Sequence, residues 1–246
     1  MNGHKSTRYL QYSLHLPNNF SSLQHRSNLS KVYLVFERNT PNSKENVSDT
    51  QETYEQLVET FIAERMVQTP ILQEKLVIGK RAINGIIKHA INYYQGDDTL
   101  TEPIEVMGLI IGAQPEKHIL YVSRIRPVTH GTPVQVQFKE EHFIHFEKAK
   151  INEKRGEFVL GWYHSHPALG VFLSVTDIVT QCHSFQLRNP KSIAIVVDPS
   201  LIPSGTKWKK DTEVFNGLSA FRLIDANQGQ YSKYYRIPYE IKTLKL

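Results

Sequence analysis

The sequence predicts a mixed α/β (α+β) fold, in which one mixed β-sheet is flanked by helices and preceded by an N-terminal extension. From residue 76 onward, short apolar runs typical of buried strands alternate with segments whose apolar residues recur at helical spacing. The chain has 246 residues and 40% hydrophobic content, enough for one medium domain with a substantial core plus an extension. We place the extension at residues 1–70 and the main domain at residues 71–246.

The extension contains two strand candidates followed by a helix. Residues 9–16 alternate between apolar and polar, and residues 31–36 form a second apolar run. A helix capped near Ser48 and ended by Pro70 then carries one apolar face, made of Tyr54, Leu57, Val58, Phe61 and Ile62. Three roles for the extension stay open: added layers of the core, a partner-docking module and a cover over the functional site.

The main domain begins with a helix and continues with strands and helices in turn. The first helix carries Ile83, Ile86, Ile87, Ala90, Ile91 and Tyr94 and ends near Gly96. The expected strands are residues 106–112, 119–125, 158–163, 192–197 and 218–223, the last of which closes the sheet. Further helices are expected at residues 138–148 and 174–187, and a surface insertion at residues 200–216.

Composition excludes several classes of protein. The single cysteine, Cys182, rules out an internal disulfide framework and a four-cysteine zinc site, and fits a reducing, cytoplasmic compartment. Cys182 falls on the apolar face of its helix, which favours a buried free thiol over a metal ligand. The net charge of +5 is scattered among acidic residues, so we expect no nucleic-acid partner. The sequence has neither a secretory leader nor a membrane span, so no membrane partner is expected.

Metal-binding side chains gather at His164-Ser165-His166-Pro167, which is followed by Ser174 and Asp177. Histidines at i and i+2 on an extended segment point to the same side, so both rings can reach one ion. A carboxylate from Asp177 would be a third ligand, leaving one tetrahedral position for water, as a catalytic zinc requires. This pattern predicts a hydrolytic zinc site on His164, His166 and Asp177.

The base that such a site requires has a candidate upstream, at Glu105. This residue precedes the apolar run of residues 106–112, which is typical of a buried strand. A carboxylate at the mouth of a strand can face the end of a neighbouring strand. Glu105 is therefore the candidate general base.

Together these residues resemble the signature of the JAMM (MPN+) metalloprotease family. A glutamate precedes an apolar strand, His-x-His-Pro-x6-Ser-x2-Asp follows, and every signature position is filled. The similarity also includes residues 193–199 and extends over residues 76 to about 236. Residues 159–164 and 220–227 are most similar to the proteasome-lid deubiquitinases of the family.

The resemblance implies an MPN-type fold and a zinc-dependent isopeptidase that removes ubiquitin or a ubiquitin-like modifier. One Zn²⁺ is then held by His164, His166 and Asp177. Glu105 takes a proton from the attacking water and returns it to the leaving amine, and Ser174 stabilises the oxyanion. These are the site residues that we carry into the structure.

The resemblance also implies how a substrate binds and which partners to expect. The modifier's tail is expected to add as a β-strand beside the zinc, paired with Val134, Gln135, Val136, Gln137 and Phe138. Phe172 is expected to form an apolar wall for that tail. A second MPN subunit and the proteasome are further partners. Because the chain stops at Leu246, without the helical tail of lid subunits, we expect a compact, archaeal-like form of the family.

Other interpretations stay open for the site and for the whole protein. Ser174-Val175-Thr176-Asp177 also fits a capping box at a helix N-terminus, and taken alone this is the better interpretation. The same metal chemistry would serve a hydrolase of sulfur-carrier-type ubiquitin-fold fusions. A catalytically latent MPN scaffold is the alternative from another class. The choice of modifier and linkage, and the oligomeric state, are not determined by the sequence.

Overall fold

The fold is taken from a computed structural model, which describes residues 47–94, 103–131, 156–203 and 217–244, with residues 145, 151 and 154 between them. Side chains are described from Gln56 onward. The expected strands at residues 9–16 and 31–36 lie outside this part of the chain, as does nearly all of the expected helix at residues 138–148. No helix of the described part is both long and apolar enough to span a membrane.

Within the described residues, eight strands form one mixed sheet in the order β7-β6-β5-β4-β2-β3-β1-β8. Its central strands are antiparallel β2 (Val106–Glu116), β3 (Ile119–His130) and β4 (Glu157–Ser165). β5 (Ile193–Val197) runs parallel to β4, and β6 (Leu218–Leu223) and β7 (Tyr234–Ile237) continue antiparallel. β1 (Lys75–Ile78) lies parallel between β3 and β8 (Tyr239–Ile241). The predicted class, a mixed sheet flanked by helices, is confirmed.

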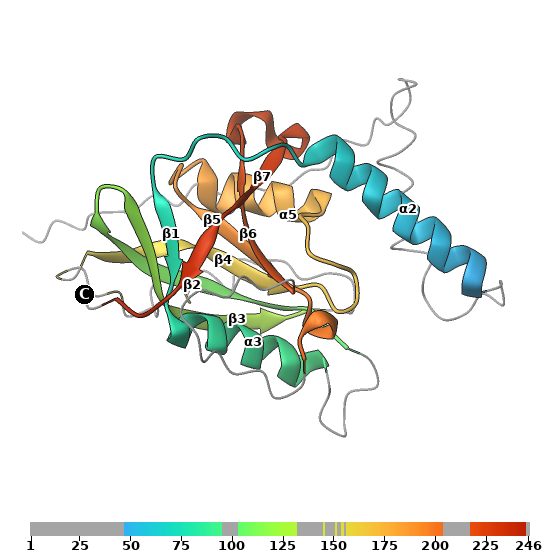
Figure 1. Cartoon of the computed structure of the whole chain (residues 1–246), viewed down its shortest axis with the longest axis horizontal. Coiled ribbons are helices and arrows are strands. Elements are labelled where there is room, and N and C mark those ends of the chain that lie inside the picture. The colour runs from blue at the N-terminus through green and yellow to red at the C-terminus, as the bar shows by residue number, and fades with distance from the viewer. Residues whose placement is uncertain are drawn as a thin grey trace, which may run out of the picture.

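Helices cover both faces of the sheet (Figure 1). α3 (Lys80–Tyr94) buries Ala82, Ile83, Ile86, Ile87 and Ala90 in a core that includes Leu76 and Ile78 of β1 and Ile193, Ile195 and Val197 of β5. On the opposite face, α5 (Val175–Thr180) contributes Ile178 to a second core, which contains Trp162 and Phe172. The predicted apolar face of α3 is thus confirmed, and β4 separates the two cores by alternation of its side chains.

Several strands differ from the predictions at their ends. β3 continues beyond Ile125 to His130, because register shifts in its pairing with β2 accommodate Pro127, which has no amide hydrogen to donate. β6 was expected to close the sheet, and this is wrong: β7 pairs on its outer side. The strands β1, β7 and β8 were not predicted.

The predicted helix at residues 174–187 is divided into two kinds of turn. α5 ends at Thr180, and a π-helical turn follows over Gln181–Gln186. The amide of Leu187 donates to the carbonyl of Cys182, five residues earlier. Cys182 and Phe185 are buried, as their positions on the apolar face predicted. The thiol of Cys182 donates to the carbonyl of Ala226, 2.9 Å away, which agrees with a structural role.

α2 (Val47–Arg65) is the one element of the expected extension in the described part of the chain. It ends at Arg65, before Thr69-Pro70. Figure 1 shows its first half extending away from the sheet and its last turns lying against the domain. Phe61 is 4% exposed and belongs to the same core as Trp162 and Phe172. Four partly buried residues of this segment pack against that core: Leu57, Val58, Ile62 and Met66. The end of α2 is therefore continuous with the core beside the predicted site.

Candidate metal centre

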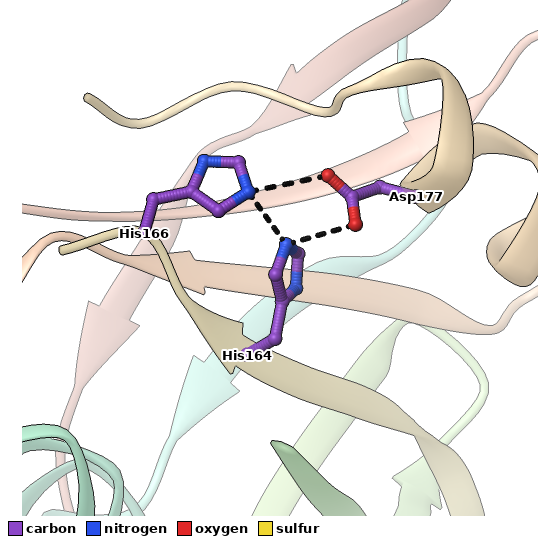
Figure 2. Close-up of side chains that lie close together, drawn as sticks. All are labelled: His164, His166 and Asp177. Carbon is purple, nitrogen blue, oxygen red and sulfur yellow. Dashed lines mark hydrogen bonds and ion pairs between the residues drawn. The ribbon is translucent and has the colours of Figure 1, made fainter. Parts of the chain in front are cut away.

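The two histidines of the predicted site leave the sheet together at the end of β4. His164 is paired with Met107 of β2 and with Val196 of β5, so its position is held from both sides. His166 lies just beyond the strand, and its amide donates to the carbonyl of Val197 at 2.9 Å. Both rings point to one side, as spacing of i and i+2 predicts, and they are 0% and 4% exposed (Figure 2).

Asp177 reaches the histidines from the first turn of α5. Its carboxylate accepts the amide hydrogen of Ser174 at 2.7 Å, and the hydroxyl of Ser174 accepts the amide hydrogen of Asp177 at 3.2 Å. This reciprocal pair is the capping box that the sequence allowed. The cap fixes the position from which Asp177 projects toward the histidines. The structural and the chemical interpretations of this segment are therefore compatible.

The three side chains converge on one point, and two of their three separations are slightly shorter than those around a tetrahedral metal ion. Nε2 of His164 lies 3.0 Å from Oδ1 of Asp177 and 3.0 Å from Nε2 of His166, which is 3.3 Å from Oδ2 of Asp177 (Figure 2). A tetrahedral ion with bonds of about 2.0 to 2.2 Å separates its ligand atoms by about 3.3 to 3.6 Å. Among the described residues, these three form a cluster whose ligand atoms all lie within 4.8 Å of one another.

The hydrogen bonding of His166 shows that its Nε2 requires a proton or a metal ion. Nδ1 of His166 lies 3.2 Å from the carbonyl oxygen of Gly170, which can only accept, so Nδ1 carries the proton. Nε2 of the neutral ring is then an acceptor and faces the carboxylate of Asp177, another acceptor. Acceptors that face one another in a buried site require a proton or a metal between them. Two imidazoles and one carboxylate are a donor set that suits Zn²⁺.

Burial and the charges of neighbouring side chains shift the pKa values of the candidate ligands in opposite directions. Burial would raise the pKa of Asp177, but the adjacent His164 and His166 lower that pKa well below its usual range. Burial lowers the pKa of His164, and Asp177 offsets only part of that effect. For His166, burial is outweighed by the hydrogen bond and charge of Asp177 and by the charge of Glu105, so its pKa is raised. The carboxylate stays ionised, as a metal ligand must.

Glu105 lies beside the metal centre. β2 and β4 are antiparallel with Met107 opposite His164, so the same register places Glu105 across from His166. The hydroxyl of Ser165 accepts the amide hydrogen of Val106 at 2.9 Å, which holds the two strand ends together. Glu105 is 4% exposed, and its charge acts on His166. The predicted base is thus brought together with the three predicted ligands.

Residues that were not predicted as part of the site contact the rings of the two histidines. Gly170 supplies the carbonyl for His166, and Asp198 in turn accepts the amide hydrogens of Ala168 and Gly170 at 3.1 and 2.8 Å. His164 stacks on Trp162 with ring centroids 4.5 Å apart and planes 14° apart. The only sequence signals were the acidic residue directly after the apolar strand of residues 193–197 and the tryptophan two positions before His164.

The predicted substrate-binding residues lie partly outside the described part of the chain. This applies to Val134–Phe138, which follow the end of β3. Phe172 is described and is 1% exposed. Its ring lies edge-on against His166, with centroids 5.1 Å apart, and contacts Phe61 of α2 at 6.4 Å. Phe172 therefore contacts both the candidate metal centre and α2.

Comparison with known proteins gives a consistent result. Residues 73–190 match the family model described as JAB1/Mov34/MPN/PAD-1 ubiquitin protease. The chain is 35% identical over 129 residues to the ubiquitin carboxyl-terminal hydrolase RPN11 of Saccharomyces cerevisiae. It is 36% identical over 132 residues to the 26S proteasome non-ATPase regulatory subunit 14 of Drosophila melanogaster. These matches cover 50% and 51% of this chain and 38% of each relative, so the chain spans less than two fifths of those relatives.

Proposed function

We propose that this chain, whose residues 73–190 belong to the JAB1/Mov34/MPN/PAD-1 ubiquitin protease family, is a zinc-dependent isopeptidase that removes ubiquitin or a ubiquitin-like modifier. One observation carries the proposal: two buried imidazoles and a buried carboxylate converge within 4.8 Å, with a second buried carboxylate, Glu105, acting on the same cluster. No structural role requires this combination of four residues. It does meet the needs of metal-assisted amide hydrolysis.

The roles of the residues follow from their positions. His164, His166 and Asp177 would hold Zn²⁺. Bound zinc supplies a Lewis acid, which polarises a carbonyl and lowers the pKa of a water molecule. Glu105 accepts a proton from the attacking water, whose oxygen forms a bond to the scissile carbonyl carbon. Glu105 then gives this proton to the lysine nitrogen as the C–N bond breaks, which leaves a free carboxylate and an amine.

Ser174 has a hydroxyl suited to stabilise the oxyanion. Its oxygen accepts the amide hydrogen of Asp177, so the cap does not use the hydroxyl proton. The hydroxyl can therefore donate to the carbonyl oxygen as negative charge develops there. In this proposal Ser174 has two functions: it caps α5 through its oxygen and stabilises the transition state through its proton.

Ubiquitin or a related modifier is the substrate class that we infer, from the family and from the names of the relatives. We place the binding of the modifier's tail on Val134–Phe138, directly after β3, as an added β-strand. Phe172 would form the apolar wall of this groove when α2 leaves it accessible. The Drosophila melanogaster relative is a 26S proteasome subunit by name, so a proteasome is a proposed partner, in the cytoplasm.

Cleavage of defined conjugates tests this proposal. The substrates are ubiquitin linked to a lysine side chain, ubiquitin fused to a C-terminal extension, and the same pair built on a sulfur-carrier ubiquitin-fold protein. Native protein is compared with chelator-treated protein, with Glu105→Gln, and with Glu116→Gln at the exposed end of the same strand. We expect cleavage that the chelator and Glu105→Gln abolish and that Glu116→Gln preserves.

Other outcomes separate the alternatives. Cleavage of only the sulfur-carrier substrates would replace ubiquitin by that class of modifier. One bound zinc per chain without cleavage of any substrate would favour a latent scaffold. Cleavage that survives both the chelator and Glu105→Gln would contradict the proposed chemistry.

A further inference from the structure

His164 and His166 are oriented in different ways. The ring of His166 is fixed by a hydrogen bond from Nδ1 to the carbonyl of Gly170. Among the residues that the structure describes, Nδ1 of His164 has no hydrogen-bond partner, although the side chain is 0% exposed. Metal-binding histidines usually depend on such a bond for the direction of the ring. Something else must therefore set the direction of Nε2 of His164.

Besides the contacts of its Nε2 with Asp177 and His166, the ring of His164 is constrained by stacking on Trp162. The two residues are i and i+2 on β4, so they share one face of the strand. Their rings are nearly parallel, at 14°, with centroids 4.5 Å apart. Phe185 is also nearly parallel to the indole, at 11°, with centroids 6.0 Å apart. The imidazole therefore lies nearly parallel to the indole, and rotation of Trp162 would turn His164.

Trp162 is itself held by a buried chain of amides. Oε1 of Gln181 accepts the indole hydrogen of Trp162 at 3.0 Å. Nε2 of Gln181 donates to Oε1 of Gln186 at 3.1 Å and to the carbonyl of Ser192 at 3.0 Å. The amide of Gln186 spans the backbone of Leu223, accepting from its N–H at 2.9 Å and donating to its carbonyl at 2.8 Å. Gln181 and Gln186 are 0% and 7% exposed.

The hydrogen bonds in this series can run in only one direction. The backbone of Leu223 fixes which end of the Gln186 amide is oxygen, because an N–H only donates and a carbonyl only accepts. The Gln186 oxygen then requires the NH₂ of Gln181, and the Gln181 oxygen is left for Trp162. A flip of either amide would set donor against donor inside the core, which is costly. β6 thus determines the orientation of Trp162 through two glutamines.

The π-helical turn makes the contact between the amides of Gln181 and Gln186 possible. In an α-helix, side chains five residues apart differ by about 140° around the axis and cannot meet. The wider π turn over Gln181–Gln186 reduces that angle and brings the two amides into contact. Short π-helical segments often occur at functional sites. The turn follows directly after α5, which provides Asp177.

We propose that Gln181 is a positioning residue of the metal centre, which acts through Trp162 to aim Nε2 of His164 at the ion. The inference rests on the proposed function, since it concerns how that site holds its metal. The backbone amide of Gln181 donates to the carbonyl of Asp177, and this bond does not depend on the side chain. Loss of the side-chain amide removes the oxygen that accepts the buried indole hydrogen of Trp162, so the indole shifts and the stacked imidazole shifts with it.

A double-mutant cycle with Co²⁺ as the probe tests this role. Gln181→Met keeps the length of the side chain and removes both amide functions, and Trp162→Phe removes the indole hydrogen that Gln181 accepts. Affinity and the visible spectrum of bound Co²⁺ are measured for native protein, both single variants and the double variant. Tyr239→Phe, which removes a buried hydrogen bond to Leu218 in the core that does not contain Trp162, controls for general loss of stability.

We expect Gln181→Met to weaken Co²⁺ binding by about 10- to 100-fold, as loss of a supporting contact does at other metal sites, and to change the spectrum. Tyr239→Phe should lower stability without either effect. In the Trp162→Phe background, Gln181→Met should add little, because the link is already broken. Equal affinity in native protein and Gln181→Met, or full additivity in the cycle, overturns the inference. Failure of native protein to bind Co²⁺ instead overturns the proposed function.

A measurement on the native side chain covers the case in which Gln181→Met does not fold. The chain has two tryptophans, Trp162 and Trp208, so Trp208→Phe assigns the indole N–H signals by NMR. We expect the Trp162 indole hydrogen to exchange slowly with solvent and its signal to shift when Zn²⁺ is added. Rapid exchange, or a signal that Zn²⁺ leaves unchanged, overturns the inference.

Discussion

Replacing Asp198 by asparagine tests how the loop between the two ligand segments is held. The carboxylate is 2% exposed and accepts four hydrogen bonds: from the amides of Ala168, Gly170 and Ser200 at 3.1, 2.8 and 2.9 Å, and from the Ser200 hydroxyl at 2.7 Å. Oδ2 serves Gly170, and Oδ1 serves the other three donors. Asparagine can keep its oxygen on those three donors, but its NH₂ then faces the amide of Gly170.

The expected effect is a loss of both stability and zinc affinity. A hydrogen bond to a charged group contributes about 1.5 to 3 kcal/mol, and Gly170 would also be left with an unsatisfied amide, so unfolding should become easier by about 2 to 4 kcal/mol. Ala168 has a φ of +59°, a strained conformation that the same carboxylate holds in place. Because Gly170 orients His166, zinc affinity should fall by about 10- to 100-fold.

Urea denaturation of the zinc-free protein and a zinc titration measure these effects separately. Asp225→Asn is the matched control, because Asp225 also accepts an amide hydrogen two residues later at the start of a short helix, far from the histidines along the chain. It should lower stability less and leave zinc affinity unchanged. Native stability and native zinc affinity in Asp198→Asn would show that the Asp198 carboxylate does not hold this loop.

Three further predictions concern the surroundings of the site. Phe61→Ala should cost about 3 to 5 kcal/mol of unfolding free energy in denaturation experiments and weaken zinc binding through Phe172, whereas Thr60→Ala on the exposed side of α2 should do neither. Burial lowers the pKa of His89 to about 4, with a contribution from the charge of His130. His89 therefore binds a proton more tightly in the unfolded chain than in the folded one, so stability should fall as pH drops from about 6.5 to 4. The melting temperature of His89→Gln should depend less on pH over this interval; an unchanged dependence would contradict the assignment. Ser174→Ala should lower the catalytic rate by about 10²-fold or more, and Ser174→Gly, which keeps most of the helix-cap stability, should lose the same rate, whereas a near-native rate in Ser174→Gly would exclude the hydroxyl as a donor.

The elements with strong periodicity were predictable from the sequence, and those that depend on distant pairing were not. α3 has apolar residues at helical spacing and β2 begins with a continuous apolar run, so both elements can be recognised in the sequence. β1 and β8 have only four and three residues, and each becomes a strand by pairing with a partner far away in the chain. β7 is rich in tyrosine and lies at the edge of the sheet, where apolar alternation is weak.

The convergence of the candidate ligands could be predicted because their residue types are concentrated in short motifs. The ligands and Glu105 are identified by residue type and by position at strand and helix ends. The supporting residues are not, because nothing local links Asp198 to His166 or Gln181 to His164. Their roles depend on the loop that returns to Asp198 and on the π-helical turn at Gln181, and both are properties of the folded chain.

Zinc binding measured together with turnover in Glu105→Gln separates metal binding from proton transfer at the site. We expect one zinc per chain in native protein and in Glu105→Gln, with conjugate cleavage only in the native protein, because Glu105 moves a proton and does not hold the metal. His166→Ala, measured alongside, should lose the zinc. Loss of zinc from Glu105→Gln, or near-native cleavage by it, would contradict the roles assigned to these residues.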